Sequence, residues 1–236
     1  MKTRGILSLF VLVSVFVCMG SHTFGAVETN YTFEFYNRYI WRGFDLNPDN
    51  KFVVQPSVDF TFGDSPWSAN LWYNYSNENH ELNEIDLTIS YILSSNENLD
   101  ITIGSVLFGW YWAKDFNTEN NTTIENFVTL AWKNQELNPE LSIYHDCKNG
   151  NGLYASLALS KEIKLSEKQN LEISSSIGYN QKQWISRSGF SDVNLKLAIP
   201  LNEGKITPFF GITWPLLDDI NPDVAREYWM GISLSF

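Results

Sequence analysis

Residues 227–236, EYWMGISLSF, alternate in character along the whole of their length. The positions of one parity carry Tyr228, Met230, Ile232, Leu234 and Phe236. The positions of the other parity carry Glu227, Gly231, Ser233 and Ser235, with Trp229 as the exception. Successive side chains of a β-strand point to opposite faces, so this stretch predicts a strand with one apolar face and one small, polar face. The strand continues to the last residue, although the termini of soluble domains tend to be poorly ordered.

Two structures explain such a stretch. One is an edge strand of a soluble β-sandwich. The other is suggested by a resemblance to the closing strand of bacterial outer-membrane β-barrels, whose assembly machinery recognises a last strand that ends on an aromatic residue. The resemblance implies that the barrel-assembly machinery is a partner and that it binds the strand ending at Phe236. The rest of the chain has to decide between the two.

The amino terminus has the character of an export signal. Lys2 and Arg4 precede an apolar run over residues 6–18, and Thr23 and Gly25 are small residues at the positions that a signal peptidase inspects. The run is shorter than the roughly 20 residues of a membrane-spanning helix. We therefore predict a signal peptide over residues 1–25 and one domain over residues 26–236.

The composition restricts the class of partner. The chain of 236 residues has 16 basic and 27 acidic residues, a formal net charge of −11. This charge argues against nucleic acid as a partner and against anionic lipid bound through a basic patch. Aromatic residues make up 15% of the chain, with nine Trp, which suits the aromatic girdles of a membrane barrel.

Period-two alternation recurs along the chain, while helical periodicity is nearly absent. The predicted strands cover residues 31–41, 51–62, 67–76, 84–93, 99–111, 123–132, 140–146, 153–165, 171–179, 192–199, 206–214 and 227–236. A membrane-spanning strand needs about 9–11 residues, and most of these segments are close to that length. An even number of strands leaves both termini on one side.

The connections favour a barrel over a sandwich. Short turns at 63–66, 94–98 and 166–170 alternate with longer loops that include 114–121, 181–189 and 215–226, as in outer-membrane barrels. A sandwich would explain the alternation but not its regularity or the aromatic end. We predict an all-β, transmembrane, antiparallel up-and-down β-barrel of about 12 strands in the outer membrane of a Gram-negative bacterium. Outer-membrane lipid surrounds it, and the first strand pairs with the last.

The polar parity of such a barrel faces its lumen. The residues that we predict to line it are Glu34, Arg38, Arg42, Asp59, Asp86, Asp100, Glu125, Glu172, Lys196 and Glu227. Acidic residues outnumber basic ones in this set, and acidic rings select cations, so we expect a porin or channel for small solutes that favours cations. The alternative is a packed interior with paired charges, because Trp72, Phe127, Phe209 and Trp229 share the inward parity.

The first hairpin resembles a known family. Residues 36–44, YNRYIWRGF, followed by Gln55-Pro56, are similar to the amino-terminal signature of the TorF-type porins. Residues 208–211, PFFG, and the last strand resemble the carboxy-terminal part of that family. The resemblance implies an outer-membrane location and a porin role, with no catalytic residues. From the alternation we expect Arg38 and Arg42 to point inward and Tyr39 and Trp41 to face lipid.

Two other functions remain open. A structural or adhesive barrel would use its outer loops to bind partners without conducting. An outer-membrane enzyme is the other alternative, and Tyr144-His145-Asp146 is its best candidate site. Neighbours on a strand point to opposite faces, however, so His145 and Asp146 are poorly placed to act together. No nucleophile elbow or metal-ligand spacing occurs, and we expect neither catalysis nor a cofactor.

Overall fold

In the computed structural model, the described residues are 26–236 except 48–50, 77–80, 111–121, 134 and 221–224. Their strands are β1 (Val27–Tyr36), β2 (Ile40–Trp41), β3 (Phe44–Asp45), β4 (Val53–Phe62), β5 (Trp67–Ser76), β6 (Glu81–Ser95), β7 (Leu99–Trp110), β8 (Thr122–Trp132), β9 (Glu140–Asp146), β10 (Gly152–Ser166), β11 (Gln169–Gln181), β12 (Ser188–Ala198), β13 (Ile206–Pro215) and β14 (Glu227–Ser235). The predicted signal peptide and the predicted loop 114–121 lie outside the described residues. Over the described part of the chain, no helix has the length and apolar character needed to cross a membrane.

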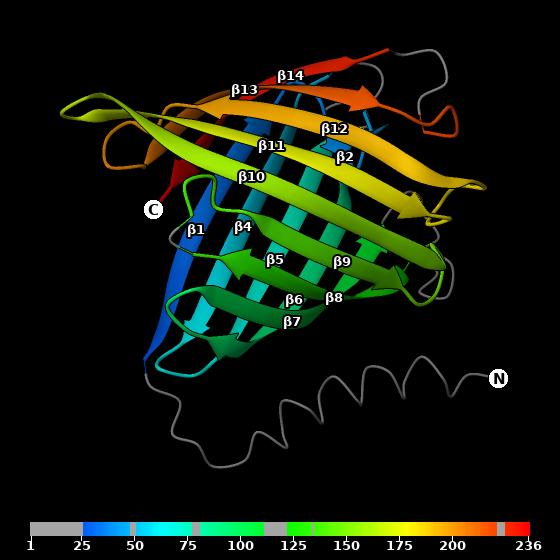
Figure 1. Cartoon of the computed structure of the whole chain (residues 1–236), viewed down its shortest axis with the longest axis horizontal. Coiled ribbons are helices and arrows are strands. Elements are labelled where there is room, and N and C mark those ends of the chain that lie inside the picture. The colour runs from blue at the N-terminus through cyan, green and yellow to red at the C-terminus, as the bar shows by residue number, and fades with distance from the viewer. Residues whose placement is uncertain (1–25, 48–50, 77–80, 111–121, 134, 221–224) are drawn as a thin grey trace.

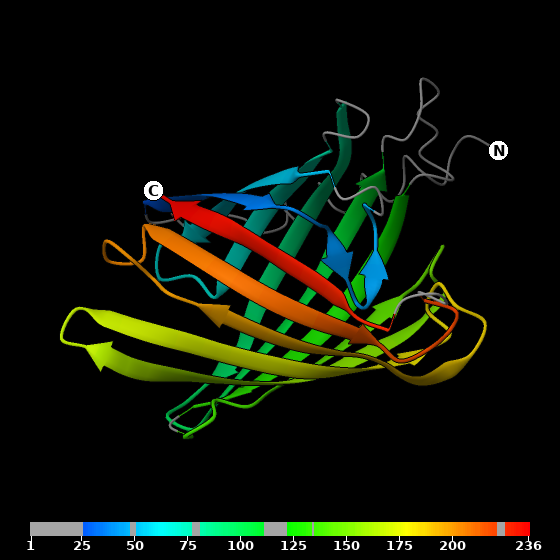
Figure 2. The same cartoon turned by 90° about the horizontal axis from the view of Figure 1, so that it is seen from above.

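Twelve of these strands close into an antiparallel barrel in which each strand pairs with its neighbours in sequence (Figures 1 and 2). The predicted fold class, an all-β antiparallel barrel of about 12 strands, is confirmed. β1 pairs with both β4 and β14, so the first strand and the last strand form the closing seam. At the seam the backbones of Tyr31 and Phe236 exchange hydrogen bonds of 3.2 and 3.0 Å. Closure leaves no free edge along the barrel wall.

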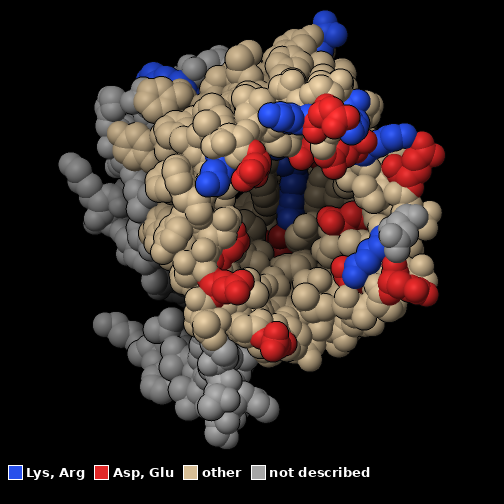
Figure 3. Space-filling model, turned by 90° about the vertical axis from the view of Figure 1, so that its left-hand side faces the viewer, with Lys and Arg blue, Asp and Glu red and all other residues tan. Residues whose placement is uncertain are grey.

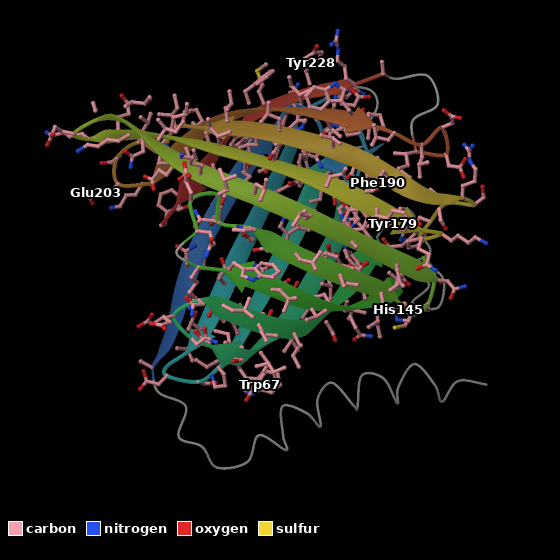
Figure 4. The ribbon with its side chains drawn as sticks, in the orientation of Figure 1. Trp67, His145, Tyr179, Phe190, Glu203 and Tyr228 are labelled. Carbon is pink, nitrogen blue, oxygen red and sulfur yellow. The ribbon has the colours of Figure 1, made fainter. Side chains whose placement is uncertain are left out.

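The outer surface of the barrel is apolar. Phe33, Ile103, Ile143, Leu157 and Phe210 lie on different strands, and each is between 38% and 45% exposed. Aromatic side chains also pair on the outer surface, and the rings of Tyr179 and Phe190 meet edge to face with centroids 5.6 Å apart (Figure 4). Soluble monomers rarely expose a continuous apolar surface of this extent.

The two ends of the barrel differ. Val27, the first residue of β1, and Ser235, the last residue of β14, lie at the same end of the barrel (Figure 1). We call this the turn end. The short connections 63–66, 96–98 and 167–168 belong to this end, and the β10–β11 hairpin extends beyond its neighbours there. The opposite end, which we call the loop end, carries the segment 37–47, which contains β2 and β3.

The first predicted strand, 31–41, is wrong beyond Tyr36. The chain leaves the wall there, and Ile40–Trp41 pairs with Phe44–Asp45 in a small separate hairpin, the β2–β3 hairpin. Arg42 and Gly43 form its turn with φ angles of 50° and 87°. Positive φ at both central residues is the mirror-image turn that suits the twist of a hairpin. The period-two pattern continues past Tyr36 to residue 41, so it gave no sign that the chain leaves the wall there.

The β2–β3 hairpin lies inside the barrel. Gly43 is buried, and a Cβ atom on it would lie 3.1 Å from the Cβ of Asp192 in β12 and 3.3 Å from a methyl group of Ile220. In Figure 2 the two short blue arrows lie between β14 in front and the green strands behind. The hairpin therefore occupies the lumen near the loop end.

Candidate functional site

Aromatic side chains of the β2–β3 hairpin reach the wall formed by β5, β6 and β7. The Tyr39 hydroxyl donates a hydrogen bond of 3.1 Å to Glu84 in β6, and its ring lies 5.8 Å from that of Trp72 in β5. The Trp41 ring meets that of Phe108 in β7 at 6.2 Å. The prediction that Tyr39 and Trp41 face lipid is therefore wrong. The chain leaves the wall after Tyr36, and this carries both side chains into the lumen instead.

Arg42 reaches the next part of the wall. Its Nη1 and Nη2 donate to the two carboxylate oxygens of Glu125 in β8, each at 2.7 Å, and Nη1 also donates to Oε1 of Gln183 at 2.6 Å. The guanidinium carbon lies 4.4 Å from the ring centroids of both Tyr144 in β9 and Tyr154 in β10. We call these four wall residues, Glu125, Tyr144, Tyr154 and Gln183, the arginine cage. A bidentate carboxylate and two aromatic faces match a planar guanidinium group.

The cage residues are held by other parts of the barrel. Gln183 Nε2 donates to Glu125 at 2.5 Å, while the Gln183 backbone N–H donates to the side chain of Asn180 at 2.8 Å. The Tyr154 hydroxyl donates to the carboxylate of Asp192 at 3.0 Å. These contacts involve no atom of the hairpin, so the wall itself keeps the cage in place.

Arg38 connects the hairpin to the seam. Its guanidinium group lies 2.8 Å from the carboxylate of Asp45 and also forms an ion pair with Glu227 of β14. Glu227 is buried, with 4% of its surface exposed. The segment that follows β1 is thus tied back to the last strand through a charge pair inside the lumen.

Carboxyl groups dominate the lumen near the loop end. The buried acidic residues there are Glu84, Asp86, Glu125, Asp146, Asp192 and Glu227. Their carboxyl groups accept hydrogen bonds from the wall, for example from Thr123 to Asp146 at 2.6 Å. Arg38 and Arg42 are the cations that the hairpin adds to this set. By formal charge, the narrow part of the lumen therefore has an excess of acidic groups.

The lumen is hollow towards the turn end, where both acidic and basic side chains lie around the opening and a basic side chain lies within it (Figure 3). A pocket of about 280 Å³ opens there, with Glu162, Glu172, Ser174 and Lys196 in its lining. The Lys196 ammonium lies 4.5 Å from the ring of Phe209.

The residues predicted to face the lumen fall into two groups. Around the hairpin, the structure brings together Arg42 with Glu125 and Arg38 with Glu227, and places Asp86 beside Phe108 in the β6–β7 register. The others lie away from the hairpin. Three of them have local partners: Glu34 accepts a hydrogen bond of 2.9 Å from the Tyr36 hydroxyl, Asp59 accepts one of 2.7 Å from Asn70, and Asp100 forms an ion pair of 2.6 Å with Lys133. Glu172 and Lys196 line the pocket near the turn end.

Sequence reasoning missed the members of the cage other than Glu125. The inward parity of Tyr144 and Tyr154 was visible, but nothing in the alternation indicates which cation they meet. Gln183 lies in a predicted loop, where the pattern carries no information about facing. Contacts between residues 42, 125 and 183 depend on the curvature of the whole barrel.

His145 and Asp146 lie on opposite sides of the wall. His145 is exposed on the outer surface, where its Nδ1 lies 3.5 Å from the sulfur of Cys147 (Figure 4). Asp146 is buried in the lumen. In the part of the chain that the structure describes, no three His, Cys, Asp or Glu side chains are grouped to hold a metal ion.

The architecture is that of a porin-like β-barrel. The KdgM porin in complex with disordered oligogalacturonate superposes with a TM-score of 0.57 at 12% identity, over 89% of this chain and 99% of that one. The NanC porin gives 0.51 at 12% identity, over 88% and 99% of the two chains. Omp33 of Acinetobacter baumannii, an outer membrane protein, gives 0.51 at 6% identity, over 89% and 97%.

At these identities the likeness concerns the fold. No protein-family model matches the chain, and no curated protein matches it significantly. The resemblance to the TorF-type porins therefore stays a prediction.

Proposed function

We propose that this protein is a channel of the bacterial outer membrane that passes small solutes and favours cations. The observation that carries the proposal is the combination of an apolar outer wall with a lumen that is hollow towards the turn end and whose buried charged residues near the loop end are mainly acidic. A wall of this kind is stable in lipid, and a polar interior holds water. The role is one of transport rather than of catalysis, and needs no cofactor.

The charge of the lumen supports the preference for cations. The acidic excess lies near the loop end, where the buried carboxyl groups include Glu84 and Glu227, whereas the pocket near the turn end is lined by two glutamates and two lysines. Rings of acidic groups attract cations and repel anions. The KdgM porin has been captured with an oligogalacturonate, which is a polyanion, and the acidic lumen of this chain fits the opposite sign of solute.

The same proposal includes a location and two partners. Outer-membrane lipid contacts the apolar wall, and the barrel-assembly machinery recognises the last strand, which ends at Phe236. The support is the position of Phe236 at the seam, where the residue is 73% exposed. The net charge of −11 fits these partners and not nucleic acid.

Single-channel recording of the purified full chain in planar lipid bilayers tests the proposal. Under a tenfold KCl gradient we expect conductance steps and a reversal potential with the sign of cation selectivity. The double variant Asp59→Asn/Glu172→Gln should lower that selectivity. Glu167→Gln, which removes a carboxylate 95% exposed at the tip of the β10–β11 hairpin, should leave it unchanged. A reversal potential with the sign of anion selectivity would contradict the preference for cations.

A structural barrel without conduction is the second candidate. It is favoured by the β2–β3 hairpin, whose side chains contact β5 to β10 and β14 and so fill much of the lumen. Replacing residues 38–45 by a Gly-Ser linker separates the two candidates. If neither the wild type nor this variant shows conductance steps, the structural role is correct and the channel is wrong.

A further inference from the structure

We propose that the arginine cage is a binding site for solutes that carry a guanidinium group, and that Arg42 occupies this site as an internal competitor. A free guanidinium solute that enters the lumen exchanges with Arg42 and releases the β2–β3 hairpin from the wall. The inference rests on the proposed passage of solutes, and it names a class of solute for that passage.

The geometry of the cage selects guanidinium over ammonium. Glu125 receives two parallel hydrogen bonds from Arg42, each of 2.7 Å, and Gln183 accepts a third of 2.6 Å. Tyr144 and Tyr154 present their ring faces at 4.4 Å. A planar, forked cation satisfies all four residues at once, whereas an ammonium group is a compact point charge that cannot form the bidentate pair.

The cage does not depend on the residue that fills it. Gln183 and Asn180 hold each other through backbone and side-chain hydrogen bonds, Gln183 holds Glu125, and Asp192 holds Tyr154. All of these residues belong to β8, to β10 to β12 or to the β11–β12 loop. A guanidinium group that arrives from solution would therefore meet a preorganised site, which lowers the entropic cost of binding.

The hairpin that carries Arg42 is joined to the wall through side-chain contacts and not through strand pairing. β2 and β3 pair with each other and, among the described strands, with no strand of the barrel. Arg42 also has a positive φ of 50°, a conformation that L-residues seldom adopt outside turns. Side-chain contacts hold the hairpin in the lumen, and a ligand that replaces the strongest of them weakens that hold.

A solute can reach the cage from the turn end. The hollow seen in Figure 3 lies on that side, and carboxylates such as Glu172 line it. The pocket there is lined by Lys161 and Lys196 as well as by Glu162 and Glu172, whereas the buried charged residues around Arg42 are mostly acidic, and such a cluster raises the local concentration of cations. A small organic cation is therefore drawn towards the acidic cluster that surrounds Arg42.

The test removes Arg42 from the cage and measures binding through the melting temperature, which does not depend on whether the barrel conducts. Arg42→Gly in the full chain, in detergent micelles, removes the internal competitor, and glycine accepts the positive φ of the turn. We expect methylguanidinium chloride to raise the melting temperature of this variant saturably in the millimolar range. Methylammonium chloride at the same concentrations should have no such effect. The wild type should need about twofold more methylguanidinium or more, because tethered Arg42 competes for the cage at an effective concentration of at least the millimolar range.

The double variant Arg42→Gly/Glu125→Gln is the matched control, and it should lose the shift. If Arg42→Gly does not fold, Arg42→Asn serves the same purpose, since asparagine tolerates a positive φ and puts no cation into the cage. The inference is overturned if methylguanidinium gives no saturable shift in the folded variant, or the same shift with and without Glu125. If methylguanidinium raises the melting temperature of a barrel that shows no conductance, the binding site is supported and the proposed channel is contradicted. If the barrel conducts but its melting temperature does not rise, the channel is supported and the binding site is contradicted.

Discussion

At the scale of single residues, the packing of Trp229 explains why an aromatic side chain stands on the otherwise small, polar face of the last strand. Trp229 occupies the small, polar parity of residues 227–236, and it faces inward. Its indole lies over Gly211, where a Cβ atom would come within 2.2 Å of the ring, and its Nε1–H donates to Thr213 at 3.1 Å. A Trp is accommodated on the polar face because the opposite strand offers a glycine beneath it and an acceptor beside it.

We therefore expect Gly211→Ala to destabilise the barrel by about 1–3 kcal/mol, the usual cost of overpacking. Equilibrium unfolding by urea in lipid vesicles measures this difference. In a Trp229→Ala background the same substitution should cost much less, since no ring remains for the new methyl group to displace. Equal costs in both backgrounds would mean that the ring does not determine the effect.

At the scale of elements, connections at the loop end are tied to one another by charge. Asp219, after β13, accepts hydrogen bonds from the backbone and side chain of Ser186 and lies 2.7 Å from the Arg187 guanidinium group. These hydrogen bonds from Ser186 and Arg187 lower the pKa of Asp219 to about 2. The β11–β12 loop and the segment after β13 are thereby linked beside the mouth of the lumen.

This link should depend on pH in a defined direction. Because the folded-state pKa of Asp219 lies below its ordinary value of 3.8, the stabilisation is complete above about pH 4 and is lost as the pH falls through about 2. The amide proton shift of Ser186, followed by NMR in micelles, should titrate with a midpoint near 2. Asp219→Asn should abolish the titration. A midpoint near 3.8 in the wild type would show that the link does not form.

At the scale of the whole molecule, closure of the barrel joins residues from the two ends of the chain. β1 and β14 pair from Thr32 with Ser235 to Tyr36 with Gly231, a shorter register than that between β1 and β4. Phe236 adds its backbone hydrogen bonds to Tyr31, and its ring meets Phe33 edge-on at 6.3 Å. Its backbone thus contributes to the seam, while most of its ring remains available to a partner.

Phe236→Ser separates these two contributions. The backbone hydrogen bonds remain, so the purified chain should refold in micelles to nearly the wild-type yield. In cells, recognition by the assembly machinery would be weakened, and the amount of heat-modifiable barrel on gels should fall several-fold. Phe210→Ser, which removes another exposed outer aromatic residue, is the control and should assemble normally. Equal losses in both variants would contradict a special role of the terminal ring.

Strand periodicity is local and records which side of a strand is apolar, so the alternation along the chain was enough to predict the barrel and the two faces of its wall strands. Residues 227–236 are the clearest case: their alternation predicted a closing strand, and β14 has that position. Only the tertiary structure decided the contents of the lumen. The turn at Arg42 and Gly43 reverses the chain within a pattern that looks continuous, and closure of twelve strands then brings Glu125, Tyr144, Tyr154 and Gln183 around one guanidinium group. Such contacts arise from curvature over the whole barrel, and no local pattern encodes them.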